Sequence, residues 1–145
     1  MNGIKPIDLR WSDLDPVGHM KHSVYYDLAA SQRIGMLHEV GLGIQELAAM
    51  GFGPVLFKEG CTFRREIRSS DQAHIQAQLM GLSNDLGRFA FRHEFFKGEV
   101  FCARLEVSCA WIDLNKRKLT TPPEKYRPAF DRIPRSEDFS SQTDI

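Results

Sequence analysis

Apolar and polar residues alternate through much of the second half of this chain. The alternating stretches are residues 55–67, 75–79, 89–95 and 101–111. A period of two is typical of strands that bury one face and expose the other. Turn residues at 84–87 and at Lys97-Gly98 separate the later stretches and favour hairpins. The pattern predicts four long strands joined as antiparallel neighbours, which must twist and curl at this length.

The first half of the chain carries one strong helical pattern. Between residues 23 and 40, apolar side chains fall on one stripe with a 3.6-residue period. The stripe consists of Tyr25, Leu28, Ala29, Met36 and Val40, widened by Ala30, Ile34 and Leu37. So wide an apolar face predicts a helix that is mostly enclosed by other elements. Residues 44–50 predict a further short helical turn, ended by a Gly- and Pro-containing breaker at 51–54.

These elements together predict an α+β architecture, a long curled antiparallel sheet wrapped around one central helix. Residues 4–10 add a short first strand, and Pro122-Pro123 ends the sheet. We expect one domain over residues 1–133. Residues 134–145 are polar, so we expect a poorly ordered, disordered tail there.

Composition excludes several classes of protein and disfavours others. The 145 residues include 19 basic and 19 acidic side chains, and this balance disfavours nucleic-acid partners. No apolar run reaches the length of a membrane span, and the N-terminus has no apolar signal region, so we expect a cytoplasmic protein. Cys61, Cys102 and Cys109 lack CxxC spacing and are interpreted as reduced thiols, neither a disulfide framework nor a zinc site.

The candidate chemistry lies in the loop between the first strand and the helix. Residues 11–22 hold Asp13, Asp15, His19 and His22 around the bend at Pro16 and Gly18. A helix N-terminus offers unpaired N–H groups and a partial positive charge, and a carboxylate offers a base or nucleophile. Capping or turn formation is the alternative role for the two acids. Carboxylate and imidazole also suit metals, but no HExxH-type pairing is present, so we expect no metal.

This loop resembles a known signature. The pattern Asp13-x-Asp15-x-x-Gly18-His19-Met20-x-His22-x-x-Tyr25 resembles that of hotdog-fold acyl-CoA thioesterases. The branch it most resembles contains 4-hydroxybenzoyl-CoA thioesterase and the thioesterase of the Tol–Pal operon. Arg33 and Gly41 also match the family's spacing, whereas Trp11 replaces a Tyr and Lys21 replaces an Asn or aromatic residue.

The resemblance implies roles for individual residues. Asp15 would be the catalytic acid, with the thioester carbonyl over the helix start near the backbone N–H of His22. The family works as dimers or dimers of dimers with the active site between subunits, so we expect a homodimer or homotetramer. An exposed edge strand of the wrapped sheet would also invite such pairing. The family needs no metal and no redox cofactor, and coenzyme A enters only as part of the substrate.

The chemistry is consistent with the residues themselves. A thiol leaving group with a pKa of about 8.5 departs as thiolate with little help from an acid. A thioesterase therefore needs a carboxylate and an oxyanion site, and it needs no GxSxG motif, which this chain lacks. We assign Asp15 as nucleophile or general base and the His22 side chain as the group that orients Asp15 or water. The expected substrate-binding residues are Gly18, His19, Ser23, Tyr25, Arg88 and Arg92, the two arginines contacting phosphates of coenzyme A.

Three alternatives to an acyl-CoA thioesterase stay open at the level of sequence. The thioester could be carried by an acyl-carrier protein instead of coenzyme A. The chain could be a hotdog hydratase or dehydratase, although those enzymes use a different motif. It could also be an acyl-binding protein that kept the fold and lost turnover.

Overall fold

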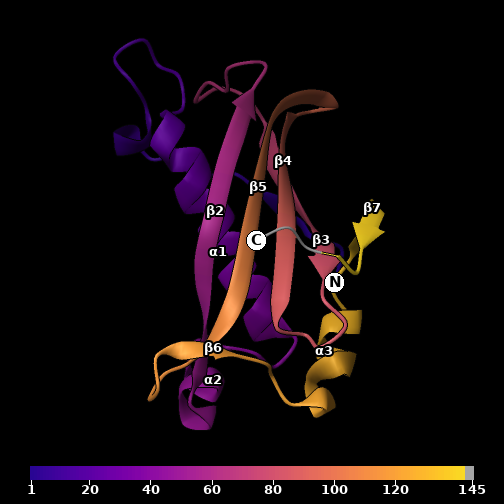
Figure 1. The fold of residues 1–145 in the computed structure, drawn as a ribbon. Coiled ribbons are helices and arrows are strands. Elements are labelled where there is room, and N and C mark those ends of the chain that lie inside the picture. The colour runs from indigo at the N-terminus through magenta and orange to yellow at the C-terminus, as the bar shows by residue number, and fades with distance from the viewer. Residues whose placement is uncertain (143–145) are drawn as a thin grey trace.

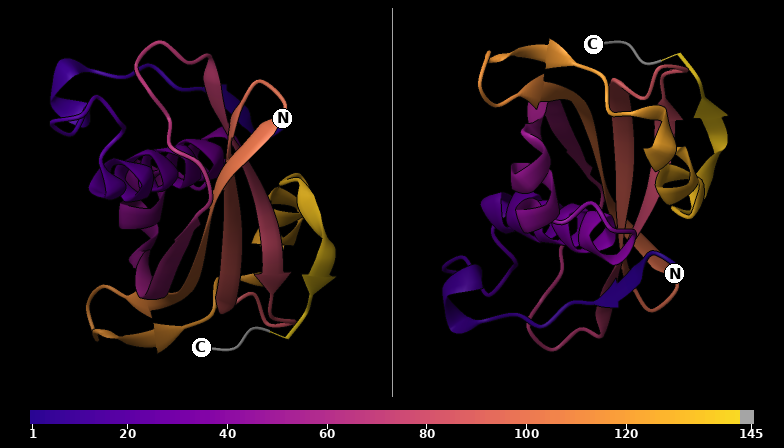
Figure 2. Two further views of the ribbon diagram at one scale, coloured as in Figure 1. Left: turned by 90° about the horizontal axis from the view of Figure 1, so that it is seen from above. Right: turned by 90° about the horizontal axis from the view of Figure 1, so that it is seen from below.

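One long helix lies across the concave face of a curved sheet (Figure 1). The structure, a computed structural model of the chain, describes residues 1–142. The helices are η1 (Trp11–Asp13), α1 (His22–Glu39), α2 (Ile44–Met50), η2 (Glu124–Tyr126) and α3 (Arg127–Asp131). The strands are β1 (Ile4–Pro6), β2 (Phe52–Phe63), β3 (Ala73–Leu82), β4 (Arg88–Lys97), β5 (Val100–Asp113), β6 (Lys118–Thr120) and β7 (Arg135–Ser140). Views along the strands show the sheet curving around α1 (Figure 2).

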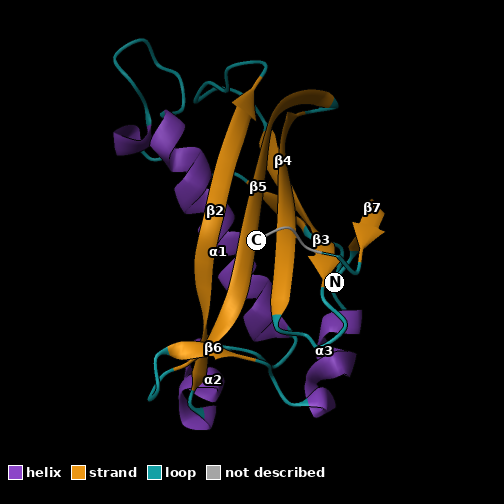
Figure 3. Ribbon diagram, in the orientation of Figure 1, coloured by secondary structure: helices purple, strands orange, loops and turns teal. Residues whose placement is uncertain are grey.

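The main sheet runs in the order β1-β3-β4-β5-β2, and all of these neighbours are antiparallel. β6 adds to β5, and β7 pairs with β3 in parallel (Figure 3). The expected α+β class, with an antiparallel sheet around one helix, is confirmed. The expectation that all four long strands are sequential neighbours is wrong for β2 and β3. Residues 64–72 carry the chain from β2 at one edge of this order to β3 on the far side of β4 and β5.

The start of α1 and the position of α2 agree with the sequence-based prediction. The Gly- and Pro-containing breaker expected at 51–54, however, does not separate α2 from the sheet. Gly51 ends α2 with φ +82, and β2 begins at the next residue, Phe52. Pro54 therefore lies within a strand. Because β2 is at the edge of the sheet, the missing N–H of Pro54 disrupts little hydrogen bonding. The first strand is also shorter than expected and ends at Pro6.

The core lies between α1 and the sheet, where Ala29 and Met36 of α1 and Phe91 and Phe95 of the sheet are buried in one cluster. The predicted apolar stripe of the helix is only partly correct. Ile34 is 48% exposed, and two polar residues of α1, Gln32 and Arg33, are buried in its place (5% and 8% exposed). Both become buried because a third polar residue, His93 of β4, faces them from the sheet.

These three side chains form a hydrogen-bonded network inside the core. Arg33 has only donors, so its Nη1 donates to Nε2 of His93 over 3.1 Å. The proton of the neutral imidazole must then be on Nδ1, which donates to Gln32 Oε1 over 2.9 Å. Burial lowers the pKa of His93 to about 3, with the nearby Arg33 charge acting in the same direction. The Gln32 amide in turn donates to the carbonyls of Gly3 and Ile75, at 2.9 and 3.1 Å.

The C-terminal segment differs from the expectation of disorder. Residues 135–140 form β7 beside β3, and the Leu79 N–H donates to the Pro134 carbonyl over 2.8 Å. Asp138 accepts two hydrogen bonds from Arg92, each 2.9 Å long. Main-chain pairing and this ion pair hold the segment in place with little apolar burial. It can therefore be polar in sequence and still be ordered. Residues 143–145 of the expected tail lie outside the described residues. Within residues 1–142, no helix is long and apolar enough to cross a bilayer.

Candidate functional site

The loop before α1 is shaped first by Asp13. Its carboxylate is buried and accepts hydrogen bonds from the backbone N–H and the guanidinium of Arg10, at 2.8 and 3.0 Å. These bonds lower the pKa of Asp13. The Asp13 carbonyl also accepts the N–H of Lys21, the residue that precedes the helix. Asp13 therefore closes the loop, and its buried carboxylate is paired with Arg10.

Asp15 is held differently, by the backbone on one side only. Its Oδ1 accepts the N–H groups of Val17 and His19 at 3.0 and 2.9 Å, and its own N–H donates to the His19 carbonyl over 2.7 Å. Gly18 makes the bend possible with φ +83, where its N–H donates to the Asp15 carbonyl. The His19 N–H contributes most to lowering the pKa of Asp15, and partial burial opposes it. Asp15 is thus ionised at neutral pH.

The second oxygen of Asp15 faces an imidazole. His19 Nδ1 lies 3.9 Å from Asp15 Oδ2, and His19 Nε2 lies 4.0 Å from Glu66 Oε1. The sequence had pointed to His22 as the group that orients Asp15. Among the described contacts it is His19 that approaches the carboxylate, whereas His22 opens α1 and lines the same pocket.

The start of α1 provides free hydrogen-bond donors beside this carboxylate. Lys21 is the N-cap residue, and no side chain caps the helix within residues 1–142. Over the same range, the Val24 N–H donates to the Lys21 carbonyl, while the N–H groups of His22 and Ser23 donate to no backbone or capping acceptor. Their partial positive charge, added to that of the helix end, suits a developing negative charge on a ligand oxygen.

A pocket of about 280 Å³ brings these groups together. Its lining consists of Asp15, His19, Met20, His22, Tyr25, Phe63, Arg64, Arg65 and Glu66. Tyr25 is 3% exposed and packs edge-on against Phe63 and Phe95, with both ring centroids 4.9 Å away. Burial raises the pKa of Tyr25 to about 12, so its phenol is neutral. The pocket thus combines a carboxylate, helix N–H groups and an aromatic wall.

Several predicted site residues lie outside this lining. Gly18 shapes the turn, and Ser23 sits in the first turn of the helix without lining the pocket. Arg88 is the first residue of β4, and Lys97 is the last. Lys97 is the end that lies beside the pocket, since it donates to the carbonyl of Glu66. Arg88 therefore lies at the end of the sheet remote from the pocket. Arg92 is engaged elsewhere, by Asp138 and Glu106.

Sequence reasoning missed the wall formed by residues 63–66. This segment follows β2 and reaches the loop because the Met20 N–H donates to the Ile67 carbonyl over 2.7 Å and His19 pairs with Arg68 in an isolated β-bridge. The contact joins positions nearly fifty residues apart, and no local pattern marks it. The alternation places Phe63 on the apolar face of a strand and Arg64 and Glu66 on its polar face, and Arg64 and Arg65 belong to the arginines that suit phosphate, but nothing in the sequence brings them to the Asp15 loop.

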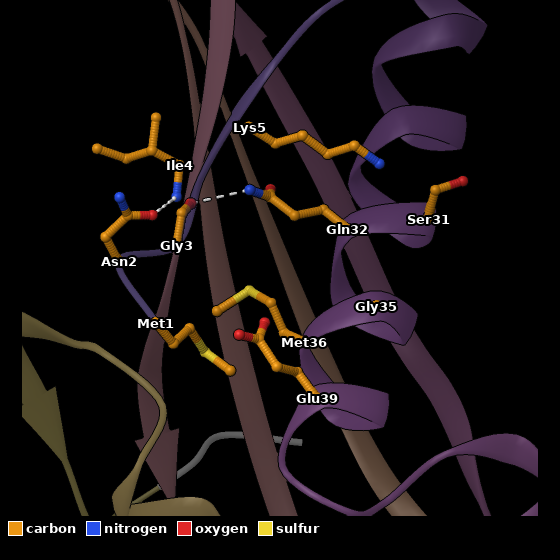
Figure 4. Close-up of a pocket in the computed structure, with 10 residues that line it drawn as sticks. All are labelled: Met1, Asn2, Gly3, Ile4, Lys5, Ser31, Gln32, Gly35, Met36 and Glu39. Atoms are coloured by element: carbon orange, nitrogen blue, oxygen red, sulfur yellow. Dashed lines mark hydrogen bonds between the residues drawn. The ribbon is translucent and has the colours of Figure 1, made fainter.

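A second cavity, of about 380 Å³, lies between the N-terminal segment and the later turns of α1 (Figure 4). Figure 4 shows the Gln32 amide reaching the Gly3 carbonyl across it. None of the predicted site residues lines this cavity. Within residues 1–142, no group of three or more His, Cys, Asp or Glu side chains is arranged to hold a metal ion.

Comparison with known families identifies the superfamily of this chain. The model of a family described as the thioesterase-like superfamily matches residues 9–130, which include the Asp15 loop, α1 and the long strands. The chain belongs to the thioesterase-like superfamily. A search of curated proteins found no match for this chain.

Solved structures share the fold with this superfamily member. Slr0204, a 1,4-dihydroxy-2-naphthoyl-CoA thioesterase from Synechocystis, is 17% identical with a TM-score of 0.77, covering 89% of this chain and 95% of its own. YbaW, a probable thioesterase from Escherichia coli, is 19% identical with a TM-score of 0.76, covering 90% and 97%. SAV2348 from Staphylococcus aureus, solved in complex with CoA, is 15% identical with a TM-score of 0.82, covering 99% and 94%. At these identities the likeness establishes the α+β hotdog fold, as expected from the sequence.

Proposed function

We propose that this hotdog protein is an acyl-CoA thioesterase, which hydrolyses a thioester to a free acid and coenzyme A. One observation carries the proposal. An ionised carboxylate, Asp15, is held by two backbone N–H groups in the same pocket as the uncapped start of α1. This pairing supplies the carboxylate and the oxyanion site that thioester hydrolysis needs, and membership of the superfamily agrees with it.

In the proposed reaction, the thioester carbonyl oxygen accepts the N–H groups of His22 and Ser23. Asp15 Oδ2 then acts in one of two ways. As a base, it takes a proton from water, the hydroxide adds to the carbonyl carbon, and the tetrahedral intermediate expels the thiolate. As a nucleophile, it adds to the carbonyl carbon itself, expels the thiolate and leaves a mixed anhydride that water hydrolyses. In both routes the thiolate takes up a proton from solvent, since its pKa of about 8.5 requires no strong acid.

The two histidines have separate roles in this proposal. His19 Nδ1 lies 3.9 Å from the free oxygen of Asp15, too far for a direct hydrogen bond, and would orient that oxygen through a bridging water. His22 lines the pocket from the helix start and positions water or the thioester. Tyr25, buried and neutral, forms the apolar wall next to the reacting group.

The substrate also requires space for its acyl group, and we propose that a second copy of the chain supplies it. β2 forms one edge of the main sheet order, and its Leu56 and Phe57 side chains are exposed. Antiparallel pairing of two β2 strands would cover these residues and set the Phe52 end of one strand against the Phe63 end of the other. An apolar cavity of about 240 Å³ lies at the Phe52 end and the Asp15 pocket at the Phe63 end. The acyl chain would then enter the cavity of the partner copy.

Light scattering at the concentration used for activity tests this arrangement. We expect a mass that is a multiple of the 16.6 kDa chain, as for a homodimer or homotetramer. A strictly monomeric mass would contradict an active site shared between copies.

The decisive experiment on the chemistry is thiol release from a panel of short, medium and long aliphatic acyl-CoAs, together with benzoyl-CoA and phenylacetyl-CoA. We expect Asp15→Asn to lower kcat by about 10²- to 10⁴-fold, because it keeps the size of the side chain and removes its charge. Asp8→Asn is the matched control, since Asp8 is an exposed acid of the same segment outside the pocket, and should leave kcat unchanged. A blank without substrate corrects for the three cysteines.

The results of this panel separate the candidate functions. Undiminished turnover by Asp15→Asn would refute the role of this carboxylate. Release only from acyl-carrier-protein thioesters would change the substrate carrier and keep the chemistry. Binding of acyl-CoA without any release would point to an acyl-binding protein. In single-turnover hydrolysis in ¹⁸O-labelled water, label in the Asp15 carboxylate would establish the nucleophilic route, in which water adds to the aspartyl carbonyl of the anhydride.

A further inference from the structure

The structure changes which arginines are available to bind phosphate groups. Arg92 is committed within the chain: its Nε donates to Glu106 and its two terminal nitrogens donate to Asp138, each over 2.9 Å. These two carboxylates neutralise its charge. Arg88 lies at the end of β4 remote from the Asp15 pocket. Neither arginine expected from the sequence is therefore available at the pocket of its own chain.

Two other arginines line the pocket because of a local irregularity after β2. The N–H groups of Arg64 and Arg65 both donate to the Cys102 carbonyl, at 2.8 and 3.0 Å. Two consecutive residues thus oppose a single residue of the neighbouring strand, which is the arrangement of a β-bulge. In a regular strand consecutive side chains point to opposite faces. Here the bulge breaks that alternation, and both arginines line the pocket that holds Asp15.

Both guanidinium groups are exposed and uncommitted. Within residues 1–142, neither side chain has a hydrogen-bond or ion-pair partner. The acid beside them, Glu66, is already engaged by Arg68, whose Nη2 lies 3.5 Å from Glu66 Oε1. Two adjacent guanidinium groups that lack carboxylate partners form a strong local positive charge, and the planar fork of each matches a phosphate group.

Their position also fits the geometry of a pantetheine-linked thioester. The buried Tyr25 ring forms the apolar interior of the pocket, whereas Arg64 and Arg65 lie at its solvent-exposed rim. In such a substrate the pantetheine arm separates the thioester from the nearest phosphate. A phosphate site must therefore lie at the rim of the pocket when the thioester reaches Asp15.

We propose that Arg64 and Arg65 form the site that binds the phosphate groups of the pantetheine carrier. This inference rests on the proposed thioesterase function and extends it to recognition of the carrier. The phosphate chemistry is shared by coenzyme A and by the phosphopantetheine arm of an acyl-carrier protein, so the experiment includes both.

The test compares thioesters that share one acyl group and differ in the carrier: acyl-CoA, acyl-carrier protein and the phosphate-free N-acetylcysteamine thioester. The variant is Arg64→Gln/Arg65→Gln. The control is Lys116→Gln/Lys118→Gln, which removes the same net charge from the exposed turn after β5 and from the first residue of β6, far from the pocket. We expect the arginine variant to raise KM for phosphate-bearing substrates by about 10- to 100-fold, with kcat changed less than about twofold.

The outcomes separate the possible sources. A rise in KM for acyl-CoA assigns the site to coenzyme A, and a rise for acyl-carrier protein alone assigns it to the phosphopantetheine arm; either supports the proposal. The N-acetylcysteamine thioester and the lysine control should show no change. An equal loss on the phosphate-free thioester would overturn the proposal, because the arginines would then act on the acyl group or the fold. An equal effect of the lysine control would also overturn it, because only the overall charge would matter.

A binding measurement makes this inference independent of turnover. Wild type and the arginine variant are titrated calorimetrically with free coenzyme A and with adenosine 3′,5′-bisphosphate. The arginine variant should bind coenzyme A about 10- to 100-fold more weakly than wild type. If the wild type binds coenzyme A through these arginines yet releases no thiol, the phosphate site stands and the proposed hydrolysis fails. If all three thioesters are hydrolysed and the arginine variant changes neither KM nor coenzyme A binding, hydrolysis stands and the phosphate site fails.

Discussion

His93 should make the stability of this protein depend on pH between about pH 6.5 and pH 5. In the folded chain, burial lowers the pKa of His93 to about 3, against an ordinary value of 6.5. Below pH 6.5 the unfolded chain therefore takes up a proton that the folded chain refuses. The contribution of this neutral imidazole is complete above pH 6.5 and is lost as pH falls toward 3.

The size of this effect follows from proton linkage alone. While pH lies between the two pKa values, each unit of acidification costs about 1.4 kcal/mol of unfolding free energy. Lowering the pH from about 6.5 to about 5 should thus remove about 2 kcal/mol. The lowered pKa values of Asp13 and Asp15 act at lower pH, because those contributions are lost only near and below the ordinary range of an aspartate. The window above pH 5 therefore isolates His93 from them.

Urea unfolding at fixed protein concentration and ionic strength, repeated across this pH window, measures the effect. His93→Gln offers an N–H and an oxygen to the network but does not titrate. It should be less stable than wild type, and its unfolding free energy should lack the decrease of about 2 kcal/mol between about pH 6.5 and pH 5. His74→Gln is the matched control, since His74 stacks on Phe96 outside the buried network, and should keep the wild-type dependence. Parallel curves for wild type and His93→Gln would refute the reasoning.

Two further predictions concern the Asp15 loop and the C-terminal strand. Gly18→Ala forces an L-residue to φ +83 and should cost about 1–2 kcal/mol in urea unfolding and lower kcat by displacing Asp15, whereas Gly18→Asn should be milder. Normal stability of Gly18→Ala would contradict this. Asp138→Asn removes a carboxylate from Arg92, so hydrogen exchange at residues 135–140 should speed up several-fold while exchange in β4 is unchanged. Unchanged exchange in β7 would show that main-chain pairing alone holds that strand.

The sequence predicted those parts of the fold that depend on short-range pattern. Alternation located β3, β4 and β5, and the apolar period located α1 to within a residue or so of its ends. The Asp15 loop could be recognised because Gly18, His19 and His22 lie within one short segment. Strand order was harder, because alternation says which residues face the core but not which strands pair. Only the long crossing at 64–72 separates β2 from β3, and its length had no distinctive signal.

The polar core residues escaped prediction for a different reason. Gln32, Arg33 and His93 are unfavourable in the core one at a time, because each would bury an unpaired polar group. Together they satisfy one another, and this property belongs to the set and to its geometry. The same reasoning applies to Arg92, whose surroundings depend on a carboxylate more than forty residues away. Hydropathy read along one chain cannot show such pairs.

Within the pocket, the proposed reacting groups and the groups that would recognise the substrate come from different segments. This separation bears on how this superfamily member could change substrate. Asp15 is positioned by main-chain N–H groups and by the turn at Gly18, and the proposed oxyanion donors are also main-chain groups. In the proposed reaction, the side chains beside Asp15 that take part are therefore His19 and His22, and neither belongs to the segment at residues 63–65. The groups that would distinguish substrates, Phe63 and the two arginines after it, come from a different strand end. Substitutions at residues 63–65 should then alter KM and substrate preference while the carboxylate and helix start stay in place, which is why kinetic effects there should fall on KM more than on kcat.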